Sequence, residues 1–593
     1  MTDEILNSFC SQNYTLCLKL CEELKKKDEK ALEFATISAI KLKLADKAIE
    51  LATKLYESKN TTFRGLNLAK AYNIAKQYEK AKDILEELLK TKELMLDIYK
   101  ELTISYLNLK NMDKLFDAYE EILKIDPYNL NIWTDYTNVV FDYNWTMAEP
   151  LFKRAIEFLT NKMKEFEKNN VLIDNPVQLA AYEKPLVERF QNIDSNKIGK
   201  YNNEISTLFN YINTKLKPKL ALCLGNIYKN QESADLFGEM IPYNQKNSQF
   251  WYDYAEILNY NSMYKDAYEA YMRSNSIDNN QESLFHLAYM FFRVGNYKEG
   301  FKIYESRLAF AHNETFSKPH YEHAINAFKQ NPKFLEGKNV IVFCEQGYGD
   351  TIMFATTITK LCNVANKVLF MPQSMLYELF TQSLEKMRAI DKNAYKNLEI
   401  SYSVPSTEGY DYVVPLTSLP LMLDMDIKEL KELPRPIFPL ERKTKNKKKK
   451  IALFWNTRMA QKDIFTRNFD FDFLNEALKD SPYELISFQV DLNIELPNYV
   501  KNRGAKFNNW YDTYNAFKDI DMLITIDSAI SHLALVLKIP TLVLLNPRFD
   551  WRWGPYEAPK AAFYDKNAYL LPCHDKEESI KKLQEIVTRV LNG

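Results

Sequence analysis

The chain has 593 residues, too many for one hydrophobic core, and about two to four domains are expected. An apolar content of 46% and a charged content of 26% are typical of a soluble globular protein. The net charge of -1 argues against a nucleic-acid partner, and no apolar run approaches the roughly 20 residues that span a membrane. Because the start, MTDEILNSFCSQN, does not resemble a secretory signal, we expect a cytoplasmic protein.

Residues 1–310 are expected to form helical repeats. LAKAYNIAKQYEKAKDILEELLK aligns with LTISYLNLKNMDKLFDAYEEILK at an offset of 34 residues, which pairs Tyr78 with Met112. MYKDAYEAYMRS aligns with NYKEGFKIYESR at an offset of 33, which pairs Tyr264 with Tyr297. The period, with small residues such as Ala81 early in the second helix, resembles tetratricopeptide repeats, whose helix pairs stack into a solenoid.

The repeat pattern breaks near residues 160–218, where we expect an irregular helical insertion. A solenoid has a concave surface that can hold peptides or protein partners. The chain contains 38 tyrosines, which either line that surface or pack between the helices.

From residue 338 onward, short apolar runs alternate with helical patterns. Strands are expected in KNVIVF, NKVLFMP, DYVVPL, KIALFW, YELISFQV, AKFNN, DMLITID and PTLVLL. This alternation is typical of parallel sheets covered by helices on both faces. The connector RPIFPLERKTKNKKKK splits the series, so we expect Rossmann-like domains at 311–440 and 441–593. We interpret Lys443–Lys450 as a solvated linker rather than a nucleic-acid site.

The first candidate site is EQGYGD, which follows the first of these strands. Gln346, Gly347 and Gly349 would form a tight cleft loop before the next helix. Asp350 either faces the ligand cleft at the carboxyl end of the strand or caps a helix starting at Thr351.

The second candidate site is IDSAISH, at another junction of strand and helix. Backbone N–H groups at Ser528 and Ala529, with the helix dipole, would bind phosphate oxygens. Asp527 would accept a hydrogen bond from a ribose hydroxyl or from His532, or would cap the helix. The alternative is a capped helix with a core histidine.

Two further stretches carry candidate ligand-binding residues. The stretch 454–469 supplies hydrogen-bond donors and cations for a phosphate leaving group: Asn456, Thr457, Arg458, Lys462 and Arg467. In NPRFDWRWGPY, Trp551 and Trp553 either pack against the core or offer a stacking surface to a base or sugar.

Taken in order, several of these pieces resemble heptosyltransferase-like glycosyltransferases of the kind fused to tetratricopeptide repeats. The matching segments are EQGYGDTIMFA, PLTSLP, FWNTRMAQKDIFTRNF, ISFQ with Gln489, YDTYNAFKDIDMLITIDSAISHLALVLKIPTLVLL and DWRWG. The resemblance implies a GT-B fold with two Rossmann-like domains facing a cleft. It also implies no metal, no cofactor besides the nucleotide-sugar donor, and transfer with inversion.

By position, the resemblance makes Asp350 the general base and places Asp527, Ser528 and His532 on the donor side. Either Lys462 or Arg467 would neutralise the phosphate. The chain departs from the family at Trp455-Asn456-Thr457, where a glycine usually follows the tryptophan, and at ALVLK, where AGALG is common. These departures concern the type of donor more than the fold.

The function expected from this resemblance is a bacterial, cytoplasmic protein O-glycosyltransferase. The repeats would hold a protein acceptor, such as flagellin or an adhesin, and a serine or threonine would be modified. Transfer to lipopolysaccharide or capsule glycan is one alternative, and a repeat scaffold with an inactive transferase domain is another. The sugar stays open between a hexose, a heptose and a nonulosonic acid.

Overall fold

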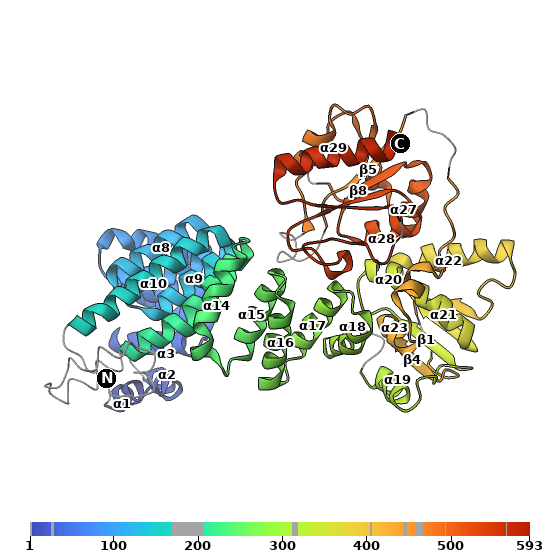
Figure 1. Cartoon of the computed structure of the whole chain (residues 1–593). Coiled ribbons are helices and arrows are strands. Elements are labelled where there is room, and N and C mark those ends of the chain that lie inside the picture. Colours follow the sequence, from blue (N-terminus) through green and yellow to red (C-terminus); the bar gives the residue numbers. More distant parts are fainter. Residues whose placement is uncertain are drawn as a thin grey trace, which may run out of the picture. The chain divides into compact units, whose positions relative to one another are not determined.

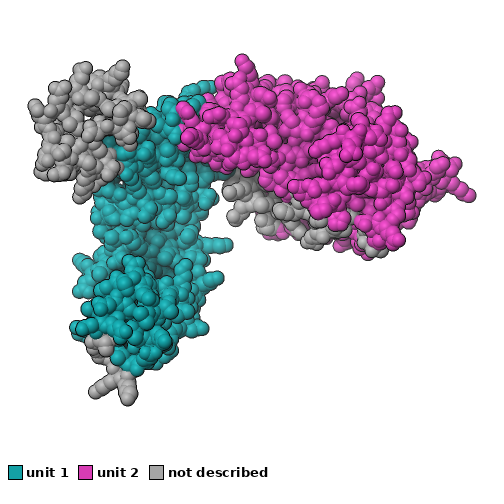
Figure 2. Space-filling model, turned by 90° about the horizontal axis from the view of Figure 1, so that it is seen from below, with its two compact units in different colours: residues 1–243 teal, residues 244–593 magenta. Residues whose placement is uncertain are grey.

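The computed structural model describes residues 3–24, 29–168, 205–310, 318–403, 406–442, 448–457, 467–492, 494–564 and 566–592 (Figure 1). The chain divides into two compact units, Met1–Tyr243 and Asn244–Gly593, which are coloured separately in Figure 2.

Unit 1 consists of helices. They are α1 (Asp3–Cys10), α2 (Tyr14–Glu23), α3 (Glu29–Lys41), α4 (Ala45–Ser58), α5 (Thr62–Ile74), α6 (Tyr78–Leu88), α7 (Met95–Asn108), α8 (Met112–Ile125), α9 (Leu130–Tyr143), α10 (Trp145–Lys168), a π-helical turn (Ile212–Leu216), α13 (Lys217–Asn226) and α14 (Asn230–Asn244). Of the insertion predicted near 160–218, residues 169–204 lie outside the described part of the chain.

The predicted repeat register is confirmed. The aligned residues Tyr78 and Met112 are the first residues of α6 and α8. Before the second helices α4, α6 and α8 the chain turns through a residue with a positive φ, 55° at Lys43, 59° at Lys76 and 57° at Lys110. The small residue Ala81 is fully buried, as the close approach of paired helices requires.

Unit 2 begins with further helices of the same kind: α15 (Ser248–Tyr260), α16 (Tyr264–Asp278), α17 (Gln281–Arg293) and α18 (Tyr297–Tyr304), followed by a 3₁₀ helix (Glu305–Ala309) and α19 (Lys318–Gln330). A Cβ atom on Gly300 would lie 2.5 Å from the ring of Phe292, so only glycine fits where α17 and α18 meet. Phe292 also packs on Trp551, with ring centroids 4.5 Å apart. These helices therefore share a compact unit with the α/β part, and the domain boundaries expected at 310 and 440 stay predictions.

The first sheet has four parallel strands in the order β3-β2-β1-β4. They are β1 (Asn339–Phe343), β2 (Lys367–Met371), β3 (Leu398–Ile400) and β4 (Tyr412–Pro415), and β3 was not predicted. The associated helices are α20 (Tyr348–Phe354), α21 (Thr356–Val364), α22 (Ser374–Ile390), α23 (Leu419–Met422) and α24 (Ile427–Glu432), with a 3₁₀ turn at Leu416–Ser418.

The second sheet has six parallel strands in the order β10-β9-β8-β5-β6-β7. They are β5 (Lys450–Phe454), β6 (Glu484–Ser487), β7 (Val500–Asn502), β8 (Met522–Ile526), β9 (Thr541–Leu545) and β10 (Ala568–Pro572). The helices are α26 (Phe471–Leu478), α27 (Trp510–Ala516), α28 (Ala529–Val536) and α29 (Lys576–Asn592), with 3₁₀ turns at Gly504–Lys506, Phe517–Asp519 and Trp551–Trp553. The predicted fold class, helical repeats followed by two parallel α/β sheets, is confirmed.

Strand β5 shows why these apolar runs are continuous. Ile451 and Leu453 pack in one core cluster with Leu583 of α29, whereas Ala452 belongs to the cluster on the other face of the sheet. Both faces are therefore covered, and α29 crosses the sheet in Figure 1. The strand predicted over AKFNN is wrong, because the chain turns at Gly504–Lys506 and the paired segment, β7, lies just before it.

Candidate functional site

A cavity of about 680 Å³ lies at the carboxyl ends of the strands in unit 2 and collects most of the predicted site residues. They come from the loops after β1, β5, β6 and β8: Gln346, Gly347, Gly349, Asp350, Asn456, Thr457, Arg467, Gln489, Asp527, Ser528, Ala529 and His532. Since β5 and β8 are neighbours where the strand order reverses, their loops diverge and leave a crevice. Arg458 and Lys462 lie outside the described residues.

Gly349 brings the two α/β halves into contact. A Cβ atom at this position would lie 2.8 Å from Cδ2 of His532 and 3.4 Å from Cα of Ala529. A side chain would therefore collide with α28, and glycine lets the loop after β1 reach the start of that helix. The carboxylate loop and the candidate anion site consequently line one cavity.

Asp350 lies in the first turn of α20, which begins at Tyr348 with Gly347 as its N-cap residue. The interpretation of Asp350 as the cap of a helix starting at Thr351 is therefore wrong. Its carboxylate accepts a hydrogen bond from Arg552 in an ion pair.

Arg552 extends this contact into a chain of alternating charges, which we call the pocket charge cluster: Asp350, Arg552, Asp550 and Arg467. Arg552 Nη1 donates to Asp550 Oδ1 at 2.6 Å, and Arg467 Nη2 lies 3.6 Å from Asp550 Oδ2. All four side chains line the cavity. The cluster therefore presents both carboxylate and guanidinium groups to a ligand.

The protonation of the cluster follows from burial and its two cations. Burial opposes ionisation of Asp550, but Arg552 and Arg467 hold its pKa below the usual value. Burial raises the pKa of Asp527, with Asp550 adding to the shift while Arg467 and Arg552 oppose it. Asp550 is thus ionised and paired with Arg552 and Arg467. Asp527 takes up a proton more readily than an ordinary aspartate, because its pKa is raised.

The start of α28 combines an N-cap serine whose hydroxyl does not cap the helix with a buried carboxylate oxygen that accepts no hydrogen bond from the described part of the chain. Ser528 is the N-cap residue, and its hydroxyl donates to the Ile526 carbonyl at 3.3 Å, with no capping bond to the described part of α28. Asp527 is 5% exposed, and its Oδ2 has no hydrogen-bond partner among the described residues. An unpartnered polar atom at the wall of a cavity is a natural contact for a polar ligand.

His532 belongs both to the core and to the cavity wall. Its Nδ1 lies 2.5 Å from the hydroxyl of Tyr564, and its ring stacks on Trp553 with centroids 5.5 Å apart. Burial, together with Arg552, lowers the pKa of His532 to about 3, so the imidazole is neutral. The bond from His532, one of the alternative roles expected for Asp527, is not made by Nδ1, whose partner is Tyr564.

The loop after β5 is held by Gln489, at the end of β6. Gln489 Oε1 accepts from the backbone N–H of Asn456 at 3.2 Å, and its Nε2 donates to the Asn456 carbonyl at 2.8 Å. Asn468 continues this support, since its Oδ1 accepts from the Thr457 N–H at 2.9 Å. Gln489 therefore acts on the cavity through the loop that it positions.

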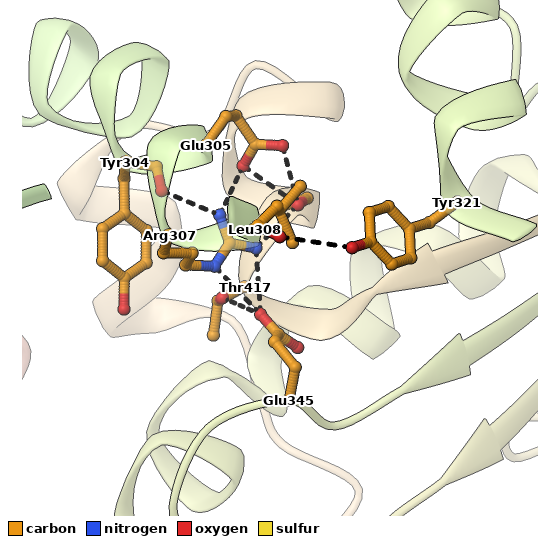
Figure 3. A network of polar contacts seen from close by, with 8 residues as sticks. Tyr304, Glu305, Arg307, Leu308, Tyr321, Glu345 and Thr417 are labelled. Atoms are coloured by element: carbon orange, nitrogen blue, oxygen red, sulfur yellow. Dashed lines mark hydrogen bonds and ion pairs between the residues drawn. The ribbon is translucent and has the colours of Figure 1, made fainter. Parts of the chain in front are cut away.

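The loop after β1 is anchored from the helical side by Arg307, as Figure 3 shows. Arg307 donates to Glu345 Oε1 at 2.9 Å and to Glu305 Oε1 at 2.6 Å. Thr417, in the PLTSLP segment, also donates to Glu345. Arg307 Nη2 also donates to the Ser418 hydroxyl at 2.7 Å, so the 3₁₀ helix after α18 is bonded to both EQGYGDTIMFA and PLTSLP.

Among the residues of the cavity wall that sequence reasoning did not name are Asp550, Arg552 and Tyr289. The first two lie within DWRWG, next to the tryptophans of a short 3₁₀ helix for which Asp550 is the N-cap residue. Trp551 and Trp553 are 2% and 0% exposed, so the packing interpretation of these two residues is confirmed. Tyr289 lies on α17, where the repeat pattern predicts only helix packing. It gives no sign that this residue lines a cavity whose other residues begin more than fifty positions later.

Across the described ranges, no cluster of three or more histidine, cysteine, aspartate or glutamate side chains is arranged to hold a metal ion. No helix within those ranges is both long and apolar enough to cross a membrane.

No family model and no curated protein matches the chain. Among solved structures, the tetratricopeptide-repeat protein YrrB, described as having an unusual peptide-binding site, matches at 14% identity and a TM-score of 0.26, over 40% of this chain and 98% of its own.

Two heptosyltransferase structures also match. The Escherichia coli ADP-heptose lipopolysaccharide heptosyltransferase II matches at 12% identity and a TM-score of 0.30, over 42% of this chain and 99% of its own. The iron-containing dodecameric glycosyltransferase TibC from enterotoxigenic E. coli matches at 13% identity and 0.30, over 44% and 76%. The two kinds of protein that the sequence resembled are thus found among the matches, and at these values the activity has to be argued from the site.

Proposed function

We propose that the protein is a glycosyltransferase that moves a sugar, with inversion, from a nucleotide-sugar donor to a hydroxyl group of a protein acceptor. One observation carries the proposal: a carboxylate from the first α/β half and a helix start from the second half line the same cavity. Inverting transfer needs a base for the acceptor and stabilisation of the departing phosphate, and these are the two features present.

The donor phosphates would lie at the start of α28. The backbone N–H groups at Ser528 and Ala529 are at the positive end of the helix dipole, and Arg467 lines the same cavity. Asp527 Oδ2 would meet a hydroxyl group of the donor. Phe488, Phe507 and Trp510 supply apolar surface for the base.

Asp350 would act as the general base. Its carboxylate takes the proton of the acceptor hydroxyl, whose oxygen forms a bond to the anomeric carbon from the face opposite the phosphate. The bond from that carbon to the phosphate oxygen breaks, and the nucleotide leaves with the electron pair. Arg552 keeps Asp550 as a partner when Asp350 is protonated, so the proton transfer leaves no buried guanidinium without a counter-charge.

The finer assignments extend the family resemblance. The acceptor residue is serine or threonine, the acceptor is a bacterial surface protein such as flagellin or an adhesin, and the reaction takes place in the cytoplasm without a metal. The glycan acceptors and the inactive scaffold remain outcomes of the experiments.

The test is a binding and turnover assay of the full chain with a panel of nucleotide sugars. We expect one donor to bind and to release its nucleotide, and Asp350→Asn to reduce that release by about a thousandfold without loss of donor binding. Asp424→Asn is the matched control, because the side chain of Asp424 is 91% exposed. A wild-type chain that binds and cleaves no donor would identify a scaffold instead.

A further inference from the structure

Two members of the pocket charge cluster lie on one short segment, residues 549–554, which we call the charge loop. Asp550 and Arg552 of this loop both line the cavity. Asp550 is the N-cap residue of the 3₁₀ helix within the loop, and its carboxylate accepts from the backbone N–H of Arg552 at 3.0 Å. Arg552 in turn pairs with Asp350, the candidate base. The position of the charge loop therefore sets which group stands beside the base.

The two tryptophans of the charge loop pack on different parts of unit 2. Trp551 packs on Phe292 of α17, with ring centroids 4.5 Å apart. Trp553 stacks on His532 of α28, with centroids 5.5 Å apart. The charge loop therefore joins a repeat helix to the α/β half that carries the candidate phosphate site.

Arg293, next to Phe292 on α17, holds both ends of the charge loop. Its side chain is buried. Arg293 Nη2 donates to the Phe549 carbonyl at 3.0 Å, and Nη1 donates to the Gly554 carbonyl at 2.8 Å. These carbonyls belong to the first and last residues of the loop. One guanidinium group of the repeats thus fixes how far apart the two ends lie.

The guanidinium of Arg293 is itself held in place, because its Cζ lies 3.7 Å from the ring centroid of Tyr556 in a cation–π contact. Both of its bonds to the charge loop are buried. A substitution that removes the guanidinium would leave two buried carbonyls without this donor, which is costly. The loop would have to move for its carbonyls to find other donors or water.

A shift of the charge loop would be felt at Asp350. A charge-assisted hydrogen bond depends on distance and direction, so a displacement of about 1 Å at Arg552 weakens its pair with Asp350. Arg293 is not itself among the described residues of the cavity wall. Its effect on the site must therefore pass through the loop that it holds.

We infer that Arg293 is a positioning residue of the transferase site: by holding both ends of the charge loop, it keeps Arg552 paired with Asp350. The inference rests on the proposed transferase function. It makes the repeat helix α17 a working part of the catalytic centre, in addition to any part that the repeats have in holding an acceptor.

The experiment compares full-length Arg293→Met, Arg552→Met and the double variant. Methionine keeps much of the side-chain length and removes the donors. Glu557→Gln is the matched control, because Glu557 accepts from Ser262 Oγ at 2.7 Å and from the Tyr264 hydroxyl at 3.1 Å. This contact also joins the repeats to the chain near the charge loop, but it does not involve the two loop carbonyls.

Nucleotide release is measured with the donor found for the wild type. The acceptor is whichever pool the wild type glycosylates, either capped peptides with a single serine or threonine or oligosaccharides. Donor Kd and the free energy of unfolding are measured on the same samples. Hydrogen exchange followed by mass spectrometry reports on the backbone of residues 549–556.

We expect Arg293→Met to lower kcat about tenfold or more and to speed amide exchange over residues 549–556, with donor Kd within about twofold of the wild type. Arg293→Lys, which can keep one of the two bonds, should lose about threefold and replaces Arg293→Met if that variant does not fold. Because Arg293 acts through Arg552, the double variant should lose no more than about twofold relative to Arg552→Met alone. Glu557→Gln should stay within about twofold of the wild type.

Three outcomes would overturn the inference while leaving a glycosyltransferase in place. The first is an unchanged kcat in Arg293→Met, and the second is a double variant in which the two losses multiply in full, as independent structural effects would. The third is a loss of kcat in Glu557→Gln as large as that in Arg293→Met. If the wild type neither binds nor cleaves any donor, the proposed function fails and the inference fails with it, and the exchange data then show separately whether Arg293 holds the loop.

Discussion

Two arginines of unit 2 are each held between two carboxylates, yet they differ in their surroundings. Arg307 bonds Glu305 and Glu345, and the side chains of Arg307 and Glu345 are 1% and 0% exposed. Arg552 bonds Asp350 and Asp550, whose side chains are 14% and 11% exposed at the wall of the cavity. Arg307 and Glu345 are enclosed by packing, although Glu305 is 19% exposed, whereas both carboxylates of the second cluster line the cavity, where a ligand or water can reach them.

The two arginines separate residues that support the fold from residues that can act on a ligand. A fully enclosed charge that loses its partner has no water to replace it, so the folded state bears the cost. A charge at a cavity wall can be rehydrated, and its loss should show first in ligand binding or turnover.

The largest effect is expected for Arg307→Ala, which leaves Glu345 buried without its cation. We expect the free energy of unfolding to fall by about 3–5 kcal/mol in chemical denaturation. The control is Arg154→Ala, since the side chain of Arg154 is 50% exposed in its pair with Glu120 and its loss should cost less than about 0.5 kcal/mol. An equal loss of unfolding free energy in the two variants would show that the Arg307–Glu345 pair stabilises the fold no more than an exposed ion pair.

Arg552→Met keeps much of the side-chain volume but removes the cation between Asp350 and Asp550. We expect nucleotide release in the donor assay to fall about 100-fold, with a smaller loss of unfolding free energy than in Arg307→Ala. Steady-state kinetics and denaturation on the same samples check this order. The comparison fails if Arg552→Met is as unstable as Arg307→Ala while it keeps wild-type turnover.

Gly349→Ala tests the contact between the two α/β halves. Its new Cβ atom would lie 2.8 Å from the ring of His532, and we expect a loss of about 1–3 kcal/mol in unfolding free energy. In Gly347→Ala the nearest contact is Asp350 Oδ2 at 3.7 Å, so this control should stay within about 0.5 kcal/mol of the wild type. A tolerated alanine at both positions would mean that the halves are separated in solution.

The smallest effect concerns pH. Because burial lowers the pKa of His532 to about 3, the unfolded chain binds a proton below its ordinary pKa of about 6.5 while the folded chain does not. Stability is therefore lost as the pH falls through this window. Between about pH 7 and pH 5, the wild type should lose about 1–2 kcal/mol more than His532→Gln, as measured by denaturation at both values. Parallel losses would place His532 in contact with water.

Much of the architecture is local in origin and was therefore predictable. Strands β5, β8 and β9 are apolar on both faces, and a period of 33–34 residues sets the register of the helix pairs. Strands β3 and β10 were both missed; in β3, three residues with one exposed carboxylate carry too little pattern. The roles of Asp350, Asp527 and the other predicted site residues stay predictions, although the fold brings the described ones to one cavity.

The apolar runs of the sequence show where the parallel strands end, and hence that Asp350, Asn456 and Asp527 lie at carboxyl edges of the sheets. The pairing of Arg552 with Asp350, the contact of His532 Nδ1 with Tyr564 and the position of Tyr289 in the cavity wall appear only in the folded chain. The physical reason is range. Periodicity and turn chemistry act between neighbours in the chain, whereas an ion pair over 202 residues exists only after the packing of several elements has placed its two charges together.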